Sequence, residues 1–551
     1  MNKTFKFPAR AKTAIYLLTA TGLTFQAANA SNLLSSSQDS PLFSPHFPEK
    51  VRTGFDCVIR SSRAISTFGC TVADYKFSLR GIPEDSHEYH RKLSEVHLRS
   101  AKRILKLCDA NKGFYVKAGQ FVAALRQVPR EYSSTLSSLQ DKAAPCRFKV
   151  IKEVLINNLG QNLSKIFLFL DEEPIAAASI AQVHHAVLKD HQEVAIKVQY
   201  PGLEQKMKLD TTIMSFLSKW VAWLFPEYRF GWLVSEFVMA ISLELDFIQE
   251  AKNSETMAKN FAKNKMVRVP SVFWDLTTSH VLTMQFCSGH KVDDVEFMKK
   301  MGINPVKVAK VLAEVFAEMI FLHGFLHGDP HPGNLLVSPE GQNGFILVLL
   351  DYGICKKLDE RFRLDYCELW KALILLDSDK IKNLGETFGV GKYSRFFPLI
   401  FTGRTIDSKS ALGKGMSTEE KNKLKQELKL LKMEDISSFM ESLPPDFLTI
   451  LRTDGLLRSV ISKLGASQQV RLLAYAKYAL YGLSPKSDHK SVKAVLSRLK
   501  ITVSYLQLRL VLAYCVPGVL ELLHRMRKFK QSLYALYERI KCNIRCLVTL
   551  Y

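Results

Sequence analysis

Two polar segments hold the residue types that could do chemistry. Residues 327–334 read HGDPHPGN, here called the aspartate loop, and residues 351–353 read DYG. Phosphoryl transfer needs a carboxylate facing the attacking group and oxygen ligands for magnesium. Mg²⁺ is a hard cation that takes carboxylate and amide oxygens. We therefore assign Asp329 as the carboxylate beside the acceptor, and Asn334 and Asp351 as metal ligands.

A cluster of turn-forming residues without any catalytic role is the alternative explanation. A single Asp-x4-Asn pattern would favour that alternative. The sequence is more specific, because His-Gly precedes Asp329, a glycine precedes Asn334, and an Asp-x-Gly follows the apolar run 345–350. This combination favours a kinase-type site.

A lysine lies in a segment that reads as a strand. Residues 193–199 (EVAIKVQ) are apolar and β-branched, and Pro201 and Gly202 end the segment with a turn. Because side chains alternate along a strand, Lys197 shares a face with Ala195. A lone strand lysine is usually solvated. The aspartate loop downstream favours the other interpretation, in which Lys197 binds the α- and β-phosphates of ATP.

An alanine-rich segment lies upstream, where a kinase has a glycine-rich loop over the phosphates. Its six residues are Ala176, Ala177, Ala178, Ser179, Ile180 and Ala181. Small side chains permit close approach to phosphate, but alanine cannot adopt the glycine-only backbone angles. We therefore expect a stiffer loop that binds nucleotide. A turn of an alanine-rich helix is the alternative, and a helix N-terminus would also bind phosphate.

Other elements are needed to position these residues. Asn304 and Pro305 are a helix-start signal, and Gly324 is the matching stop. The apolar run 345–350 predicts a buried strand that ends at Asp351. A further helical pattern covers the region before Gly113, which is followed by the tetrapeptide KAGQ.

The composition is that of a globular protein. Hydrophobic residues make up 47% of the chain and charged residues 23%. The formal net charge of +23 favours anionic partners such as phosphates or an anionic membrane surface. The basic residues are scattered, and no nucleic-acid-binding motif is visible, so we expect no nucleic-acid partner.

The N-terminus has the composition of a targeting segment. Residues 1–30 are basic and contain no acidic residue. Basic, acid-poor composition is typical of a mitochondrial presequence, whereas a short apolar stretch followed by Ala28-Asn29-Ala30 is typical of a secretory signal. We expect mitochondrial residence, because an ATP-dependent catalytic segment and cysteines without a C-x2-C pair suit a reducing compartment.

Taken together, the motifs resemble a known family. They are Lys-x-Gly-Gln at 117–120, the alanine-rich segment, Val-Ala-Ile-Lys ending at Lys197, Glu-Leu-Asp-Phe at 244–247, the aspartate loop and Asp-Tyr-Gly at 351–353. This set resembles the aarF-domain family of atypical kinases, also called ABC1 or UbiB, from about residue 50 to about residue 480. The stretches VHLRSAKRI, MIFLHGF and FRLDYCELW resemble its animal members.

The resemblance implies an α+β, bilobal, protein-kinase-like fold that binds ATP and Mg²⁺. Glu244 resembles the residue that pairs with the phosphate-binding lysine, although Glu250, expected in the same helix, is a close alternative. Lys117 and Gln120 resemble the gating motif of an N-terminal extension that packs on the cleft. Asp246 resembles the acidic end of the family's Glu-x-Asp element. We expect Lys117 to pair with the acids near Glu244.

The implied organisation has five parts. Residues 1–30 are a presequence, 31–50 a linker, 51–150 the helical extension, 151–480 the kinase-like domain, and 481–551 a helical region. Within the last part, residues 501–520 are apolar but contain Arg509 and Pro517. That pattern favours a buried or membrane-interfacial helix over a spanning one.

The family resemblance implies a mitochondrial kinase or ATPase that supports lipid or coenzyme Q homeostasis, with an unknown acceptor. ATP hydrolysis is better supported in the family than protein phosphorylation. The alternative from another class is a catalytically silent, nucleotide-binding scaffold at the inner membrane. A small-molecule kinase with a similar His-Gly-Asp loop is a third interpretation, and the Lys-x-Gly-Gln element argues against it.

Overall fold

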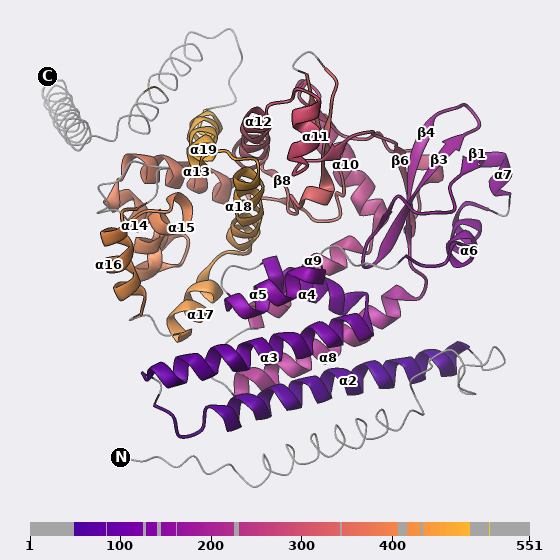
Figure 1. Ribbon diagram of the computed structural model, residues 1–551. Helices are drawn as coiled ribbons and strands as arrows, with labels where there is room; N and C mark the ends of the chain where they lie inside the picture. The colour runs from indigo at the N-terminus through magenta and orange to yellow at the C-terminus, as the bar shows by residue number, and fades with distance from the viewer. Residues whose placement is uncertain are drawn as a thin grey trace, which may run out of the picture. The chain divides into compact units, whose positions relative to one another are not determined.

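The computed structural model describes residues 49–83, 85–124, 128–139, 145–160, 162–224, 231–341, 344–405, 416–429, 433–484 and 506 (Figure 1). The predicted presequence, nearly all of the predicted linker and most of the predicted C-terminal region lie outside these residues. The chain divides into two compact units, which are described separately. The first comprises Met1–Lys259, Val269–Ser288 and Asp351–Ile354, and the second Asn260–Arg268, Gly289–Leu350 and Cys355–Tyr551.

The first unit begins with helices. They are α2 (Glu49–Ser78), α3 (His87–Asn111), α4 (Phe114–Ala124), α5 (Arg130–Leu136) and the 3-10 turn η2 (Ser137–Leu139). Ser86 begins α3 by accepting a hydrogen bond from the amide of Tyr89. Gly113 has a φ of +48°, so the expected helix stop is present between α3 and α4.

A buried ion pair joins α2 to α8 (Leu203–Leu224), two helices that lie side by side in Figure 1. The guanidinium of Arg60 contacts the carboxylate of Asp210 and donates to the carbonyl oxygen of Asn111. Arg60 is 7% exposed and Asp210 is fully buried. Loss of either partner would leave an unpaired charge in the interior. The contacts of Arg60 therefore fix α2 against both α8 and the end of α3.

An antiparallel sheet follows. Its strands are β1 (Phe167–Leu170), β2 (Ala176–Ala177), β3 (Ala181–Leu188), β4 (Glu193–Gln199) and β6 (Val281–Gln285), in the order β1-β3-β4-β6 with β2 on β3. Strand β4 is the predicted lysine-bearing strand. Its residues Val194, Ile196 and Val198 are buried with α6 (Phe148–Leu159) and α7 (Leu163–Ile166). Ala195 packs on the opposite side, as the alternation predicts.

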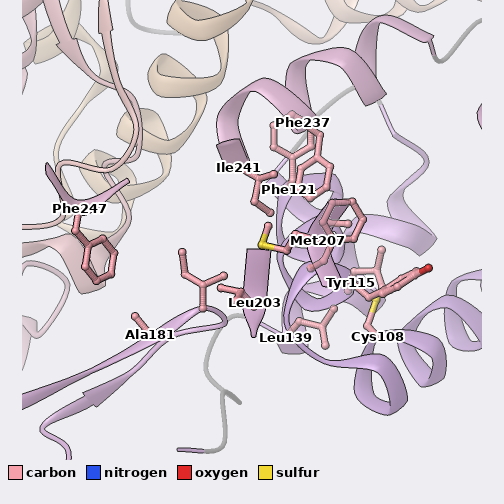
Figure 2. Close-up of a cluster of buried hydrophobic side chains, with 14 of the residues drawn as sticks. Cys108, Tyr115, Phe121, Leu139, Ala181, Leu203, Met207, Phe237, Ile241 and Phe247 are labelled. Atoms are coloured by element: carbon pink, nitrogen blue, oxygen red, sulfur yellow. The ribbon is translucent and has the colours of Figure 1, made fainter. Parts of the chain in front are cut away.

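The core on that opposite side joins the sheet to the extension. Figure 2 shows Phe121 and Phe237 packed together, with Met207 and Ile241 beside them. The ring centroids of Phe121 and Phe237 lie 5.4 Å apart. These side chains come from α4, α8 and α9 (Gly231–Glu244), and Phe247 at the start of α10 (Phe247–Phe261) belongs to the same cluster. Apolar packing therefore sets the position of α4, which carries the Lys-x-Gly-Gln motif.

The second unit has two small sheets. One has the order β5 (Val267–Arg268), β10 (Ile346–Leu349), β9 (Leu335–Ser338) and β7 (His290–Lys291), and the other pairs β8 (Phe325–His327) with β11 (Cys355–Lys357). Strand β10 is the predicted apolar strand, and Leu347, Val348 and Leu349 are fully buried in it.

The predicted long helix is present. Asn304 accepts a hydrogen bond from the amide of Val306 and begins α12 (Pro305–Glu318). A π-helical turn, η4 (Met319–His323), follows, and Gly324 ends it with a φ of +59°. Strand β8 starts directly afterwards, so the helix leads straight into the aspartate loop.

Helices complete the second unit. They are α11 (Val295–Lys300), α13 (Glu360–Leu375), α14 (Ser378–Thr387), α15 (Phe397–Thr402), α16 (Thr418–Lys429), α17 (Met433–Ser442), α18 (Pro445–Lys463) and α19 (Gln468–Gly482). Aromatic rings of Tyr366, Trp370, Phe401 and Phe447 fill its core. Within the described residues, no helix combines the length and apolar character needed to cross a membrane. The α+β class is confirmed.

Candidate functional site

Lys197 is held by two carboxylates within the first unit. Its ammonium nitrogen donates to both carboxylate oxygens of Glu250, at 2.7 and 2.9 Å, and lies 3.3 Å from Oδ1 of Asp351. The Lys197 side chain is 10% exposed and that of Glu250 only 1%. The sequence assignment of Glu244 as the partner of Lys197 is therefore wrong, and the alternative residue, Glu250, occupies that position.

Burial and charge act in opposite directions on this pair. Burial would lower the pKa of the Lys197 ammonium, but Asp351 and Glu250 outweigh it and raise the pKa above its ordinary value. Burial raises the pKa of Glu250 to about 7, against the lowering effect of Lys197. Lys197 therefore carries its positive charge at neutral pH in a place where water is scarce.

The reason for the misassignment is a helix break. Helix α9 ends at Glu244, and α10 begins at Phe247, so Glu244 and Glu250 do not share the single helix that the sequence suggested. Asp246 lies in the break, where its carboxylate accepts hydrogen bonds from the amides of Ile248 and Gln249 and caps α10. This cap sets the direction of the helix that carries Glu250.

The expected ion pair of the extension is present. The ammonium nitrogen of Lys117 lies 2.9 Å from Oε1 of Glu244, and the two side chains are 21% and 8% exposed. Asp246 caps α10, and Glu244 is the acid that Lys117 contacts. The amide nitrogen of Gln120 donates to the carbonyl oxygen of Leu139 at 2.9 Å. Gln120 thus fastens α4 to η2, while Lys117 joins α4 to α9.

Asp351 has an uncommon backbone conformation. Its φ is +58°, a left-handed value that few residues other than glycine adopt. The amide of Gly353 donates to Oδ1 of Asp351 at 3.3 Å, and the side chain of Asn253 in α10 donates to the carbonyl oxygen of Tyr352 at 3.0 Å. A Cβ atom at Gly353 would lie 3.3 Å from Cγ of Glu244. The segment is therefore held between α9 and α10.

The alanine-rich segment is a hairpin. Ala176 and Ala177 form β2 and pair with Val183 and Gln182 of β3. No residue of this segment has a positive φ, so alanine fits here without strain. The helix-turn alternative is wrong. The side chains of Ile180 and Ala181 are buried in the core, so these two predicted nucleotide-binding residues present only backbone to a ligand. Ala178 is exposed, and Ser179 is half-buried.

The aspartate loop is held by hydrogen bonds within the second unit. His327 is fully buried; its Nδ1 accepts from the amide of Asp329 at 3.2 Å, and its Nε2 donates to the carbonyl oxygen of Leu350 at 2.9 Å. The Asn334 side-chain nitrogen donates to the carbonyl oxygen of Asp329 at 3.1 Å and lies 3.4 Å from its Oδ2. The carbonyl oxygen of Asn334 accepts from the amide of Leu350 at 2.9 Å. These bonds fix Asp329 and Asn334 relative to the end of β10.

The comparisons with known proteins decide the family. The model of the ABC1 atypical kinase-like domain matches residues 138–385. AarF domain-containing protein kinase 1 of Xenopus laevis is 38% identical over 412 residues, which cover 74% of this chain and 79% of that protein. The protein of the same name from Mus musculus is 39% identical over 411 residues, or 74% of this chain and 78% of that protein. This chain belongs to the ABC1, or aarF-domain, family of atypical kinases.

A more distant member is also similar. AarF domain-containing kinase 1 of Drosophila melanogaster is 34% identical over 413 residues, which cover 74% of this chain and 80% of that protein. The resemblance drawn from the motifs is thereby confirmed, together with the kinase-like fold that it implied.

The predicted metal ligands have the chemistry that a magnesium ion requires. Asp351 offers a carboxylate. The side-chain nitrogen of Asn334 points to Asp329, so Oδ1 of Asn334 remains as the ligand atom. Among the described residues, no group of three or more histidines, cysteines or acids could hold a metal alone. Each of these donor types suits Mg²⁺, because Mg²⁺ is commonly bound by one or two protein ligands together with substrate phosphates.

One residue beside the aspartate loop was not predicted. Arg452 in α18 places Nη2 3.6 Å from Oδ1 of Asp329. The hydroxyl oxygen of its neighbour Thr453 lies 3.4 Å from the carbonyl oxygen of Gly328. No local pattern could have shown these contacts, since more than a hundred residues separate the partners along the chain.

Proposed function

We propose that this ABC1 family member is an ATP-binding, Mg²⁺-dependent atypical kinase or ATPase. The contact between Lys197 and Glu250 is the observation that carries the proposal. A buried ion pair often adds no more stability than apolar residues of similar volume, so stability alone does not explain Lys197, and one of its two carboxylates belongs to Asp351, the predicted metal ligand. Such a lysine suits the α- and β-phosphates of ATP.

Each residue has a distinct part in the proposed reaction. Lys197 binds phosphate oxygens, and Glu250 holds its ammonium in place. Asp351 and Asn334 would hold Mg²⁺, which would neutralise phosphate charge when bound. Asp329 accepts the proton of the attacking hydroxyl or water while the bond between the γ-phosphorus and the leaving oxygen breaks. His327 accepts a hydrogen bond from the amide of Asp329, and Asn334 donates one to its carbonyl oxygen; both bonds restrict the loop and so reduce the motions available to Asp329.

The helical extension is proposed to limit access to the nucleotide. Lys117 pairs with Glu244, and Glu244 lies against the segment that carries Asp351. The buried cluster of Figure 2 fixes α4 in the same place. A substitution at Lys117 would therefore change both the packing of the extension and the position of the segment that carries Asp351.

A mitochondrial location and a part in lipid or coenzyme Q homeostasis complete the proposal. Residues 1–30 are basic and acid-free, which supports a presequence. Deleting them should leave a tagged chain in the cytosol. Glycosylation or secretion of the full-length chain would show instead that Ala28-Asn29-Ala30 ends a secretory signal.

A nucleotide-binding scaffold is the second candidate function. Two observations favour it: the alanine hairpin replaces a glycine-rich loop, and the extension is tied down by Lys117. The scaffold would bind nucleotide without turning it over. Turnover therefore separates the two functions.

The test is ATP turnover by the purified protein, with and without Mg²⁺ and with and without lipid vesicles. We expect hydrolysis that requires Mg²⁺ and is lost in Lys197→Met. The matched control is Lys208→Met, which removes an exposed lysine of α8 whose ion pair is with Glu204. Nucleotide binding without any turnover would establish the scaffold, and absence of binding would refute both functions.

A further inference from the structure

Helix α18 contacts the aspartate loop at two successive positions. Nη2 of Arg452 lies 3.6 Å from Oδ1 of Asp329, and the hydroxyl oxygen of Thr453, which donates to the carbonyl oxygen of Thr449 at 2.9 Å, lies 3.4 Å from the carbonyl oxygen of Gly328. Thr453 is fully buried. One helix therefore meets both the backbone of the loop and the side chain that is proposed to face the acceptor.

The contact between Arg452 and Asp329 is an ion pair. At 3.6 Å the two atoms are too far apart for a hydrogen bond, so the guanidinium acts through its charge. The side chains are 15% and 23% exposed, which limits screening by water. Asn334 lies on the other side, 3.4 Å from Oδ2 of Asp329. The carboxylate is thus held between a cation and an amide, one beside each oxygen.

Helix α18 is itself fixed in the second unit. Asp454 is 2% exposed and pairs with Arg458 at 2.6 Å and with Arg471 at 2.8 Å. At the start of the helix, Asp446 accepts from the amide of Asp359 at 3.0 Å and lies 3.3 Å from Nζ of Lys356. Arg452 therefore extends from a helix that cannot easily shift.

We propose that Arg452 is a positioning residue for Asp329, a role that rests on the proposed function. Its guanidinium attracts Oδ1 of Asp329 and keeps the carboxylate oriented while the acceptor binds. A guanidinium stays protonated at any ordinary pH, so Arg452 cannot take the acceptor's proton in place of Asp329. The residue acts on the rate of turnover through Asp329 and has no part in nucleotide binding.

The test compares Arg452→Met and Arg452→Lys with the wild-type protein in Mg²⁺-dependent ATP turnover. In Arg452→Met we expect kcat to fall by about 10- to 100-fold, with KM and the Kd for ATP changed less than about twofold. Arg452→Lys should recover much of the loss, because it restores the positive charge. The matched control is Lys463→Met on the same helix, whose ion pair is with Asp293. That variant should turn over ATP at the wild-type rate.

A second measurement separates positioning from folding. In an Asp329→Asn background, Arg452→Met should cause a smaller fall in Tm than in the wild-type background, because the carboxylate that it pairs with is absent. A merely structural role would lower Tm equally in both backgrounds and would show no recovery with lysine. Either of those results overturns the inference.

Failure of the inference can be told from failure of the proposed function. An active wild-type protein in which Arg452→Met leaves kcat unchanged overturns the role of Arg452 alone. A wild-type protein without Mg²⁺-dependent turnover overturns the proposed function, and the role of Arg452 with it.

Discussion

The ammonium nitrogen of Lys117 lies 2.9 Å from Oε1 of Glu244, and this contact joins the helical extension to the end of α9. Glu244 in turn lies against Gly353, two residues after Asp351. A single acidic residue therefore contacts the extension on one side and lies against the segment that carries Asp351 on the other.

Lys117→Ala should destabilise the first unit by about 1–3 kcal/mol, because it removes the cation beside a carboxylate that is 8% exposed. The loosened extension should also change the affinity for ATP relative to ADP. Thermal unfolding and titration calorimetry measure both effects. Lys106→Ala, at an exposed lysine of α3, is the control. Unchanged Tm, turnover and nucleotide affinity in Lys117→Ala would show that the pair has no effect.

Glu250→Gln should change how stability depends on pH. The pKa of Glu250 is raised to about 7 in the folded protein from an ordinary value of 4.5, so the folded state binds the proton more tightly than the unfolded state. The resulting stabilisation is fully present below pH 4.5 and is lost as pH rises through about 7. This contribution to the free energy of unfolding is on the order of 3 kcal/mol.

Denaturant unfolding at pH 5 and pH 8 measures this effect in the wild type and in Glu250→Gln. We expect the free energy of unfolding of the wild type, relative to the variant, to be larger at pH 5 than at pH 8. An equal difference at the two pH values would contradict the raised pKa.

Gly119 of the Lys-x-Gly-Gln motif has a packing role. A Cβ atom there would overlap Cδ1 of Leu139 and lie 3.2 Å from Sγ of Cys108. Gly119→Ala should therefore cost about 1–3 kcal/mol. Gly69→Ala is a matched control in α2, where a Cβ atom would meet nothing within 4 Å, and it should stabilise by about 0.5–1 kcal/mol. Equal Tm values for the two variants would contradict this account.

Local signals predicted much of the fold. Asn304 and Gly324 delimit the helix and π-helical turn that lead into the aspartate loop, and the apolar runs at 193–199 and 345–350 mark strands β4 and β10. These predictions succeeded because capping residues and runs of apolar residues act over a few residues of sequence.

Contacts between distant residues could not be predicted in this way. The choice between Glu244 and Glu250 depended on a helix break at Asp246. The sequence motifs did not predict that break. The position of Arg452 beside Asp329 depends on the tertiary packing of α18. The motifs thus identified residue types, and the structure was needed to identify their partners.

The most direct test of the central claim compares Asp351→Asn with Asp329→Asn in calorimetry of Mg²⁺-ATP binding and in turnover. Asparagine tolerates the left-handed backbone at Asp351, so the first substitution removes the charge of a metal ligand without backbone strain. The account predicts that Asp351→Asn weakens Mg²⁺-ATP binding by about tenfold or more. It also predicts that Asp329→Asn abolishes turnover while largely sparing nucleotide affinity. Two variants that bind and turn over ATP as the wild type does would contradict the site.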